Sequence, residues 1–533
     1  MPKFLLVGPY DPHCGEYTFL APPLGVWRLA GVLKSHGIQV EVFDPNCCEG
    51  PPDQAFELKL LCDSWDVIGI STTGMTLRFD LELAHIARRM ARDAIIVAGG
   101  MEATFKPELM FELGPFDRVV LGEGEQPLLE LAARLRAQQS LGGIRGMAER
   151  QADGKVLRLQ QPALTREQLR DAIFATPYES MPYEAYWDRL EAAYRVGALP
   201  SKAAREASLA EIRSVRLITL NYCPMGCTFC SSTNFLHEAQ GEVAAIARLD
   251  ADECIQMIHR IVAAHPSVRT IIFQDDIFVF TKDRRVIALC EAIVAAKAQG
   301  SIPRDLQFIS TNRIDAMSLE RLEAMRRAGF RVLGFGIESF SPNVLQEFNK
   351  AQIHRHIEPM LTATLDMGIT PFLDLILSSP RASIDDIAHT LREAYRWVRQ
   401  GCEVGMYPYV IPFSGAAFAR DLSLRSHTQY ARRHINGTNI EWEQAAKILP
   451  IDPDVREFIL RLEADFEALL EAYQDRAAHL PSRIRSLMWI LASVPLLAER
   501  GIIIATEVEV RAELEARLPQ VRRAAAPRLA ASV

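Results

Sequence analysis

The chain has 533 residues, of which 49% are hydrophobic and 24% are charged, a balance typical of a folded globular protein. Its length predicts about three to four domains and allows a large core without disulfide staples. The 59 basic and 67 acidic residues give a formal net charge of −8, so we expect no nucleic-acid partner.

The start of the chain and its longest apolar run both argue against export or membrane insertion. Met1-Pro2-Lys3 leads directly into the apolar run 4–7, with no small-residue cleavage site behind it. The longest apolar run, residues 487–498, is interrupted by Pro495 and is too short to span a bilayer. We therefore expect a cytoplasmic protein without a transmembrane segment. Its ten cysteines are then expected to be ligands, catalysts or core residues rather than disulfides.

The first 145 residues alternate between short strands rich in valine and isoleucine and amphipathic helices. Strands are expected at 4–7, 39–43, 66–71, 94–98 and 118–121, and helices at 24–36, 81–92 and 127–138. This alternation predicts an α/β domain with a parallel, doubly wound, Rossmann-like sheet. Ligands of such sheets bind beyond the carboxyl ends of the strands. Those ends carry Thr72-Thr73-Gly74, Gly99-Gly100 and Gly122-Glu123-Gly124.

A second series of strands and helices follows a less regular stretch. Residues 146–210 are interpreted as a linker and wrap-around segment. Strands are then expected at 215–220, 270–273, 306–310, 331–336, 371–377 and 404–411. Six strands with helical connections over 211–425 predict a partial (β/α)6 barrel of the TIM type. Residues 426–533 are expected to form a helical region.

Three cysteines on one short loop are the most informative motif. Cys223-Pro-Met-Gly-Cys227-Thr-Phe-Cys230 follows the first strand of the second series. Three thiolates can each bind one iron of a four-iron, four-sulfur (4Fe-4S) cluster, which leaves the fourth iron open for a substrate or cosubstrate. A zinc site would need a fourth ligand, for which His237 is the near candidate. Three inert buried cysteines are the remaining alternative, although Asn221 and other polar neighbours would then need accommodation.

The cysteine spacing, with an aromatic residue before the last cysteine, resembles the radical S-adenosylmethionine (SAM) superfamily. The upstream doubly wound domain resembles the cobalamin-binding branch of that superfamily. The motifs that carry this second resemblance are Pro22-Pro23-Leu24-Gly25, Asp44, Gly99-Gly100 and Gly122-Glu123-Gly124-Glu125. The resemblance covers roughly residues 1–425 and implies three cofactors: a 4Fe-4S cluster, SAM and cobalamin.

The resemblance also implies roles for particular residues near the cluster. Cys223, Cys227 and Cys230 would bind the cluster, and Phe229 would lie against the adenine of SAM. Many members carry Gly-Gly-Glu after the second barrel strand to meet the SAM amino group, whereas this chain has Asp275 and Asp276. Further contacts with the SAM ribose and carboxylate are expected from Ser310, Asn312, Arg313, Glu338 and Ser339. An ordinary ion pair between Arg313 and Glu338 is the alternative.

Small residues in the first domain are expected to hold the nucleotide tail of cobalamin, because glycine allows close approach of the backbone. The expected residues are Ser71, Thr72, Thr73, Gly99 and Gly100, with Gly122, Glu123 and Gly124 near the tail. The alternative is that each glycine merely ends a strand. Asp11-Pro12-His13-Cys14-Gly15 is one residue short of the Asp-x-His-x-x-Gly motif of other cobalamin proteins, so we expect no cobalt ligation by His13.

The resemblance implies an enzyme that methylates an unactivated carbon of a small-molecule or natural-product substrate. The methyl group would pass through methylcobalamin, and a 5′-deoxyadenosyl radical would activate the substrate. The alternative with the same cofactors is a radical cyclase, rearrangement or oxidation enzyme without methyl transfer. A non-catalytic cobalamin sensor or carrier is a third possibility. The radical chemistry implies an external one-electron reductant, such as flavodoxin or ferredoxin.

Overall fold

We describe a computed structural model of the chain, which forms two compact units. The structure describes residues 2–10, 21–74, 76–199, 201–241, 244–350, 352, 354–435, 438–473 and 482–518. Unit 1 comprises Met1–Gly334, Phe348–Ile369 and Ile411–Ile448. Unit 2 comprises Phe335–Glu347, Thr370–Val410 and Leu449–Val533.

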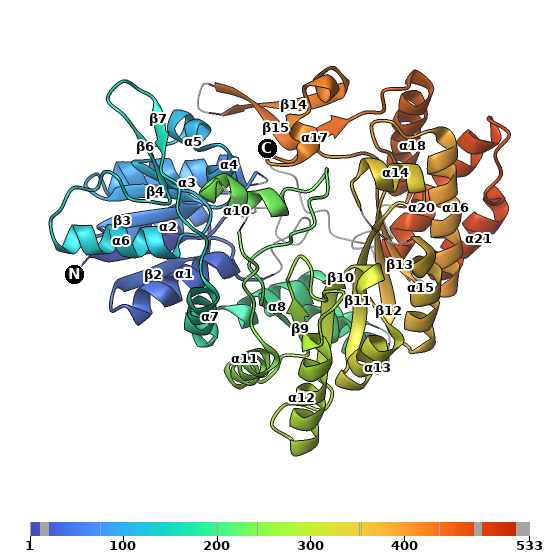
Figure 1. Ribbon diagram of the computed structural model, residues 1–533, viewed down its shortest axis with the longest axis horizontal. Helices are drawn as coiled ribbons and strands as arrows, with labels where there is room; N and C mark the ends of the chain where they lie inside the picture. Colours follow the sequence, from blue (N-terminus) through green and yellow to red (C-terminus); the bar gives the residue numbers. More distant parts are fainter. Residues whose placement is uncertain are drawn as a thin grey trace. The chain divides into compact units, whose positions relative to one another are not determined.

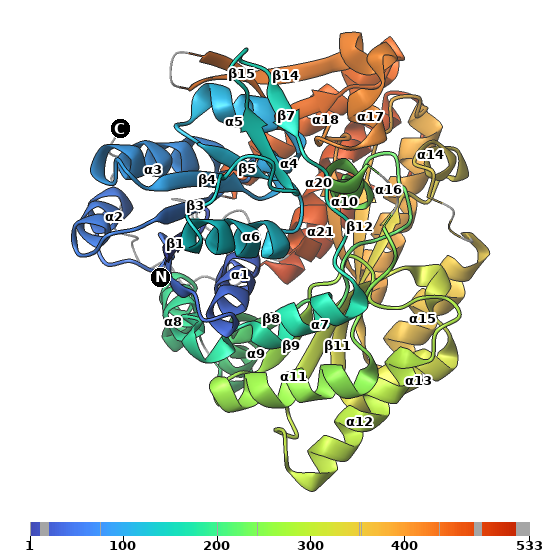
Figure 2. The same ribbon diagram turned by 60° about the vertical axis from the view of Figure 1, so that its left-hand side comes forward.

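The first sheet lies in unit 1 and has the strand order β2-β1-β3-β4-β5-β6-β7. Its parallel strands are β1 (Lys3–Val7), β2 (Gln39–Phe43), β3 (Val67–Ser71), β4 (Ile95–Gly99) and β5 (Arg118–Val120). Helices cover both faces of this sheet (Figures 1 and 2). The helices are α1 (Leu24–Ser35), α2 (Pro52–Leu61), α3 (Leu77–Met90), α4 (Met101–Phe105), α5 (Pro107–Leu113) and α6 (Glu125–Arg136). The structure thus confirms the doubly wound α/β domain.

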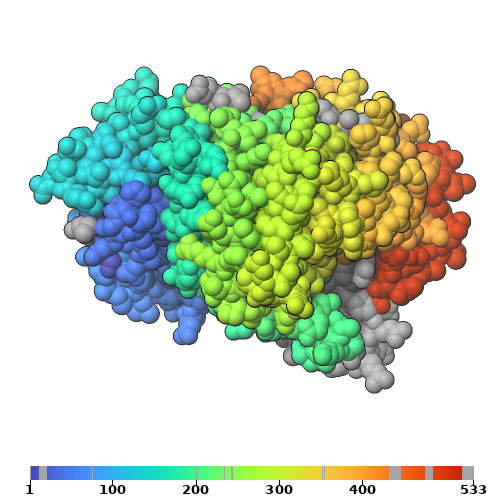
Figure 3. Space-filling view, turned by 60° about the horizontal axis from the view of Figure 1, so that its bottom comes forward, coloured from blue at the N-terminus to red at the C-terminus, as the bar shows by residue number. Residues whose placement is uncertain are grey.

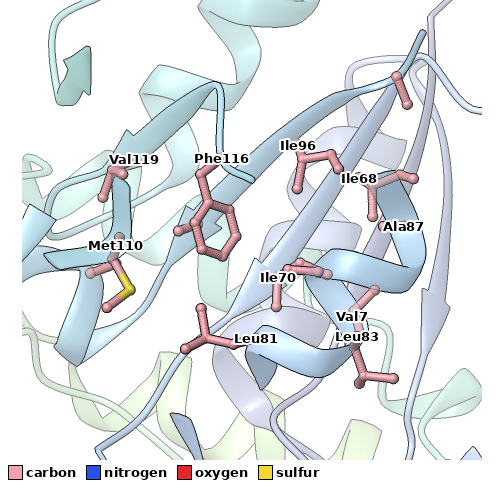
Figure 4. Packing of buried hydrophobic residues seen from close by; sticks show 14 of the residues in the cluster. Val7, Ile68, Ile70, Leu81, Leu83, Ala87, Ile96, Met110, Phe116 and Val119 are labelled. Atoms are coloured by element: carbon pink, nitrogen blue, oxygen red, sulfur yellow. The ribbon is translucent and has the colours of Figure 1, made fainter. Parts of the chain in front are cut away.

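Two apolar clusters enclose this sheet because alternate strand residues point to opposite faces. In β1, Phe4 and Leu6 enter the cluster beneath α1 and α6, whereas Leu5 and Val7 enter the cluster beneath α2 and α3. Figure 4 shows the second cluster, in which Leu81 of α3 packs among side chains of the sheet. Burial on both faces explains why these strands read as continuous apolar runs.

Residues 146–212 both extend the first sheet and connect it to the second. Strands β6 (Met147–Arg150) and β7 (Val156–Arg158) join the sheet in antiparallel orientation, so the sheet continues past residue 145. Three helices follow: α7 (Arg166–Ala175), α8 (Tyr183–Ala193) and α9 (Lys202–Ile212). The buried aromatic rings of this segment include Tyr183 and Trp187, which lie 5.9 Å apart between centroids.

The second sheet has six strands in the order β13-β12-β11-β10-β9-β8, all at positions expected from the sequence. They are β8 (Ser214–Leu217), β9 (Thr270–Phe273), β10 (Gln307–Asn312), β11 (Phe330–Glu338), β12 (Thr370–Ile376) and β13 (Glu403–Tyr407). The boundary between the two units falls within β11. In unit 1, α11 (Ala251–Ala264), α12 (Arg285–Gln299) and α13 (Leu319–Ala328) follow successive strands and form the green to yellow surface in Figure 3. The sequential strand order and helical connections confirm the partial barrel.

The region after residue 425 differs in part from the expected helical pattern. A two-stranded antiparallel hairpin, β14 (Thr428–Ile435) and β15 (Thr438–Ile448), lies in unit 1. In unit 2, three helices follow: α18 (Pro453–Ala472), α20 (Ser482–Ala498) and α21 (Glu507–Arg517). Trp489 of α20 stacks on Phe466 of α18 with 3.7 Å between ring centroids. Across the residues that the structure describes, none of the helices combines the length and apolar composition needed to cross a membrane.

Leu81 tests the packing of the first domain. Its side chain has no exposed surface, and Leu81→Ala should lower the free energy of unfolding by about 2–5 kcal/mol through lost burial and a residual cavity. Leu58→Ala is the matched control, because Leu58 lies in the same domain and is 62% exposed. Urea unfolding of the full chain should show the loss for Leu81→Ala and a change within about 0.5 kcal/mol for Leu58→Ala. Equal effects would contradict the packing described.

Candidate functional site

The cysteine loop connects β8 to α10 (Ser232–Gln240) within unit 1. Cys223, Cys227 and Cys230 are all half-buried, and their thiols are not paired in disulfides. The loop is held by its backbone: the N–H of Thr228 donates to the Phe348 carbonyl at 3.0 Å, and the Thr228 carbonyl accepts from the Phe418 N–H at 3.0 Å. These bonds present the three cysteines on one fixed loop.

A turn and an aromatic contact complete the shape of the loop. Gly226 has a φ of 67°, a left-handed conformation that favours glycine, and its carbonyl accepts a hydrogen bond from the Asn349 amide at 3.0 Å. Phe229, expected against adenine, packs edge to face on Phe348 with 5.0 Å between centroids. This contact orients the ring, and its contact with adenine stays a prediction.

The donor set of three cysteines fits a 4Fe-4S cluster, in which each thiolate binds one iron. Within the described ranges, no three His, Cys, Asp or Glu side chains converge closely enough to hold one ion, and His237 is exposed. Cysteines that bind different irons of a cluster stand apart, because the cluster's own sulfides fill the space between them. Burial, together with the nearby charges of Asp276, Cys230 and Cys227, raises the pKa of Cys223 to about 11. Binding to iron would relieve this cost, because it stabilises the thiolates.

The two aspartates after β9 have different surroundings. Asp275 is buried, and its carboxylate accepts hydrogen bonds from the Thr219 N–H at 2.6 Å, the Thr219 hydroxyl at 2.5 Å and the Leu220 N–H at 3.0 Å. Burial raises the pKa of Asp275 to about 6, while the Arg285 charge opposes the shift. Asp276 accepts a hydrogen bond from Ser232, at the start of α10. Asp275 thus holds the entry to the cysteine loop, and Asp276 lies beside the cysteines.

The residues expected around the SAM ribose and carboxylate already have partners. Ser310 and Asn312 are buried, and the Asn312 amide donates to the Ser310 carbonyl at 3.1 Å and hydroxyl at 3.0 Å. Arg313 forms two hydrogen bonds with Asp315, at 3.0 and 2.8 Å. These partners orient the end of β10, and the expected contacts with SAM stay predictions.

The last strand residue of β11 has an unusual backbone. Glu338, in unit 2, is buried and has a φ of 63°, which is rare for a residue with a side chain and marks a strained position. Ser339 is fully buried, and its hydroxyl lies 2.9 Å from that of Thr390 on α16 (Ile384–Gln400). The strain agrees with the placement of Glu338 at a functional strand end.

Hydrogen bonds join the strand-end loops of the first sheet that were expected to hold the cobalamin tail. The Thr72 N–H donates to the Gly99 carbonyl at 2.7 Å, and the Thr72 hydroxyl accepts from the Ala103 N–H at 3.2 Å. Gly100 has a φ of 101°, and a Cβ there would lie 2.5 Å from the Thr72 carbonyl oxygen. The Thr104 hydroxyl accepts from the Gly122 N–H at 2.9 Å. The structure therefore brings the loops after β3, β4 and β5 together.

The remaining residues expected near the tail fall into two groups. Ser71 and Thr73 are half-buried at the end of β3, where side chains can still reach a ligand. Glu123, next to Gly124, turns toward the linker, and its carboxylate accepts from the Leu164 N–H at 2.8 Å. Burial and the neighbouring Glu125 raise the pKa of Glu123. His13 lies outside the described residues.

Helix α10 links the cysteine loop to these strand ends. It starts two residues after Cys230, and a Cβ built on Gly122 would lie 2.5 Å from the Cβ of Ala239 near its end. Phe235 packs edge to face on Phe105 of α4, with 6.2 Å between centroids. Glu238 forms ion pairs with Arg158 at 2.8 Å and with Arg420 at 2.9 Å. The helix that follows the cysteine loop thus contacts the loop after β5 and α4 within one unit.

Two buried aspartates in this region carry interactions that sequence analysis did not identify. Asp44 accepts from the Tyr186 hydroxyl at 3.0 Å and the Asn46 N–H at 3.1 Å, so it ties the end of β2 to α8. Asp80, on the first turns of α3, accepts from groups on two separate loops. The only signal in the sequence is its position four residues after Thr76, which is also typical of an ordinary helix start.

Two protein families match this chain. The B12 binding domain family matches residues 12–132, and the radical SAM superfamily matches residues 217–394. The chain therefore carries a B12 binding domain followed by a radical SAM domain.

Curated relatives include methyltransferases and a cyclase. An uncharacterized methyltransferase, PH0819, from Pyrococcus horikoshii is 24% identical over 379 residues, which cover 70% of this chain and 73% of the relative. The anaerobic magnesium-protoporphyrin IX monomethyl ester cyclase of Rubrivivax gelatinosus is 25% identical over 390 residues, which cover 71% of this chain and 62% of the cyclase. The chain thus matches less than two thirds of the cyclase.

Solved structures share the fold. OxsB, a cobalamin-dependent S-adenosylmethionine radical enzyme solved with aqua-cobalamin and S-adenosylmethionine bound, aligns with a TM-score of 0.65 at 16% identity. The alignment covers 97% of this chain and 75% of OxsB. The radical S-adenosylmethionine methyltransferase TsrM from Kitasatospora setae, solved with cobalamin and a [4Fe-4S] cluster, aligns with a TM-score of 0.61 at 16% identity over 81% of both chains.

The contact between Gly122 and Ala239 makes a test of the α10 link. Gly122→Ala combines a left-handed φ of 72° with a methyl group too close to Ala239, so we expect a loss of stability and weaker iron loading. Gly143→Ala is the control, because Gly143 has a φ of 77° with open space around it. Urea unfolding should show about 1–2 kcal/mol lost for Gly143→Ala and about 1–3 kcal/mol more for Gly122→Ala. Similar losses in the two variants would contradict the contact.

Asp44 predicts a pH dependence of stability. Burial raises its pKa from 3.8 to about 6, against the opposing hydrogen bonds of Asn46 and Tyr186. Between pH about 4 and 6 the folded chain therefore binds more protons than the unfolded chain, so this group's contribution to stability falls as pH rises. Asp44→Asn should flatten the dependence in that window by up to about 1.4 kcal/mol per pH unit. Urea unfolding at a series of pH values measures this, and an unchanged slope would contradict it.

Proposed function

Because this chain belongs to the cobalamin-binding branch of the radical SAM superfamily, we propose that it methylates an unactivated carbon of a small-molecule substrate. The observation that carries the proposal is the attachment of the cysteine loop, through α10, to the strand ends of the B12 binding domain. A methyltransferase relative and a shared fold with cobalamin-dependent enzymes support it.

The cofactors are a 4Fe-4S cluster, SAM and cobalamin. When bound, the cluster supplies the electron that cleaves SAM to a carbon radical, and cobalamin supplies the methyl group. Cys223, Cys227 and Cys230 would hold the cluster, and Asp276 would meet the SAM amino group. Asp275 positions the start of the cysteine loop through Thr219 and Leu220.

The chain's own residues position these groups rather than perform the chemistry. The backbone bonds of Thr228 hold the cysteine loop in place, while Thr72 and Thr104 hold the loops of the first sheet. An electron must enter from outside, so we propose a one-electron carrier such as flavodoxin or ferredoxin as a partner. A cytoplasmic location accords with that partner and stays a prediction.

A second candidate function is radical cyclisation, rearrangement or oxidation without methyl transfer, which the cyclase relative favours. The same cofactors serve both reactions, so the products decide between them. Methylation consumes one SAM as methyl donor, giving S-adenosylhomocysteine, and another as radical source, giving 5′-deoxyadenosine. The alternative gives 5′-deoxyadenosine without matching S-adenosylhomocysteine.

Anaerobic reconstitution tests the cluster. The protein should bind about four irons per chain, and changing Cys223, Cys227 or Cys230 to alanine should abolish reductive SAM cleavage. Cys62→Ala is the control, because Cys62 is an exposed free cysteine outside the loop, and it should retain full cleavage. Cleavage by a variant that lacks all three loop cysteines would overturn the assignment.

The substrate experiment follows from the same preparation. Small molecules extracted from a host with and without the gene are compared by mass spectrometry, and compounds that accumulate without the gene are tested as substrates. We expect a product heavier by one CH2 unit, with S-adenosylhomocysteine and 5′-deoxyadenosine in equal amounts. A product without an added methyl group would favour the second candidate.

A further inference from the structure

The first sheet has a crossing point between β1 and β3. Its order β2-β1-β3-β4-β5 places the helix after β1 on one face and the helix after β3 on the other. The chain therefore leaves the carboxyl ends of these two neighbouring strands toward opposite faces of the sheet. Ligands of doubly wound sheets bind at such a crossing point.

One buried carboxylate joins residues that follow these two strands. Asp80 has no exposed surface. One of its oxygens, Oδ1, accepts from the Tyr10 N–H after β1 at 3.1 Å. The other, Oδ2, accepts from the Thr73 N–H after β3 at 3.3 Å and from the Thr76 hydroxyl at 2.6 Å.

The connection continues to the next strand. The hydroxyls of Thr73 and Thr76 lie 2.8 Å apart, which fixes the turn between β3 and α3. The hydroxyl of the adjacent Thr72 donates to the Gly99 carbonyl at the end of β4 and accepts from the Ala103 N–H in α4. Hydrogen bonds therefore connect the surroundings of Asp80 with the ends of β1, β3 and β4.

The cost of burying this group supports a functional role. Desolvation raises the pKa of Asp80 to about 7, because the donors around it compensate only part of the lost hydration. An apolar residue would fill the same space in the core at lower cost but could not join two backbone N–H groups.

We propose that Asp80 is a positioning residue that holds Tyr10, after β1, in register with the loop after β3 and so shapes this crossing point for the nucleotide tail of cobalamin. The inference rests on the proposed function, because it takes cobalamin as the ligand of the first domain. It assigns Asp80 to the tail rather than to the corrin ring. A substitution of Asp80 should therefore leave the affinity for a corrinoid without a nucleotide tail unchanged.

Asp80→Asn tests the proposal while keeping the size of the side chain. An amide offers one acceptor oxygen, so the N–H of either Tyr10 or Thr73 loses its partner and faces a donor instead. Equilibrium dialysis of the full chain against hydroxocobalamin and against dicyanocobinamide, which lacks the nucleotide tail, gives the two affinities. We expect hydroxocobalamin binding to weaken about tenfold or more, and dicyanocobinamide binding to stay within about twofold.

Two further variants separate positioning from a general loss of structure. Asp386→Asn is the matched control, because Asp386 in unit 2 is a buried carboxylate that accepts from Ser341, Ser383 and Asn343. It should leave both corrinoid affinities unchanged. Thr76→Val keeps the Asp80 carboxylate and removes one donor, so it should weaken hydroxocobalamin binding selectively but less than Asp80→Asn.

The outcomes of these binding experiments distinguish the role of Asp80 from the proposed function. Unchanged hydroxocobalamin affinity in Asp80→Asn, or an equal loss for both corrinoids, would overturn the role of Asp80 while leaving the proposed function intact. A wild-type chain that binds neither corrinoid would overturn the proposed function and this inference with it. Selective loss of hydroxocobalamin affinity supports both.

Discussion

The contact of α10 with the first sheet is the constraint on which the site depends. Ala239 approaches Gly122 so closely that no side chain fits between them, and α10 begins two residues after Cys230. The position of the cysteine loop is therefore tied to the end of β5. Ion pairs of Glu238 with Arg158 and Arg420 reinforce the contact from both sides. The loop after β5 and the helix that follows the cysteines are therefore packed directly against each other.

Buried carboxylates at strand ends provide the second layer of organisation. Asp44, Asp80 and Asp275 each accept a backbone N–H from a loop, and burial raises the pKa of each. Such groups are costly, because their hydrogen bonds replace only part of the hydration lost. Their benefit is geometric: one carboxylate has enough acceptor sites to fix two loops at once. The free-energy cost of burying a carboxylate therefore falls at irregular backbone segments that must keep a fixed shape.

The sequence predicts the strands and the cysteine ligands well, because their signals are local. Phe4–Val7 reads as a buried strand from its composition alone, and the spacing of Cys223, Cys227 and Cys230 is itself the motif. The antiparallel strands β6 and β7 and the hairpin of β14 and β15 were not expected, since their pairing is set by tertiary neighbours rather than by strong periodicity. Asp80 was missed for a related reason. Its partners, Tyr10 and Thr73, come from loops far apart in the chain, and the residue itself resembles an ordinary acid at a helix start.

At the second sheet, the sequence does not predict in which direction the polar side chains at the strand ends point. Asp275 and Asp276 are adjacent and chemically identical. Asp275 accepts hydrogen bonds from the backbone of Thr219 and Leu220, whereas Asp276 lies beside the cysteines. Ser310 and Asn312 share the strand face of the buried Phe308, so they bind each other. A polar residue at a strand end is therefore a weak indicator of ligand contact. The Asn312 amide nitrogen is used within the strand end, whereas its Oδ1 is buried without a hydrogen-bond partner among the described residues, so one side chain can both shape a site and keep an acceptor for a ligand.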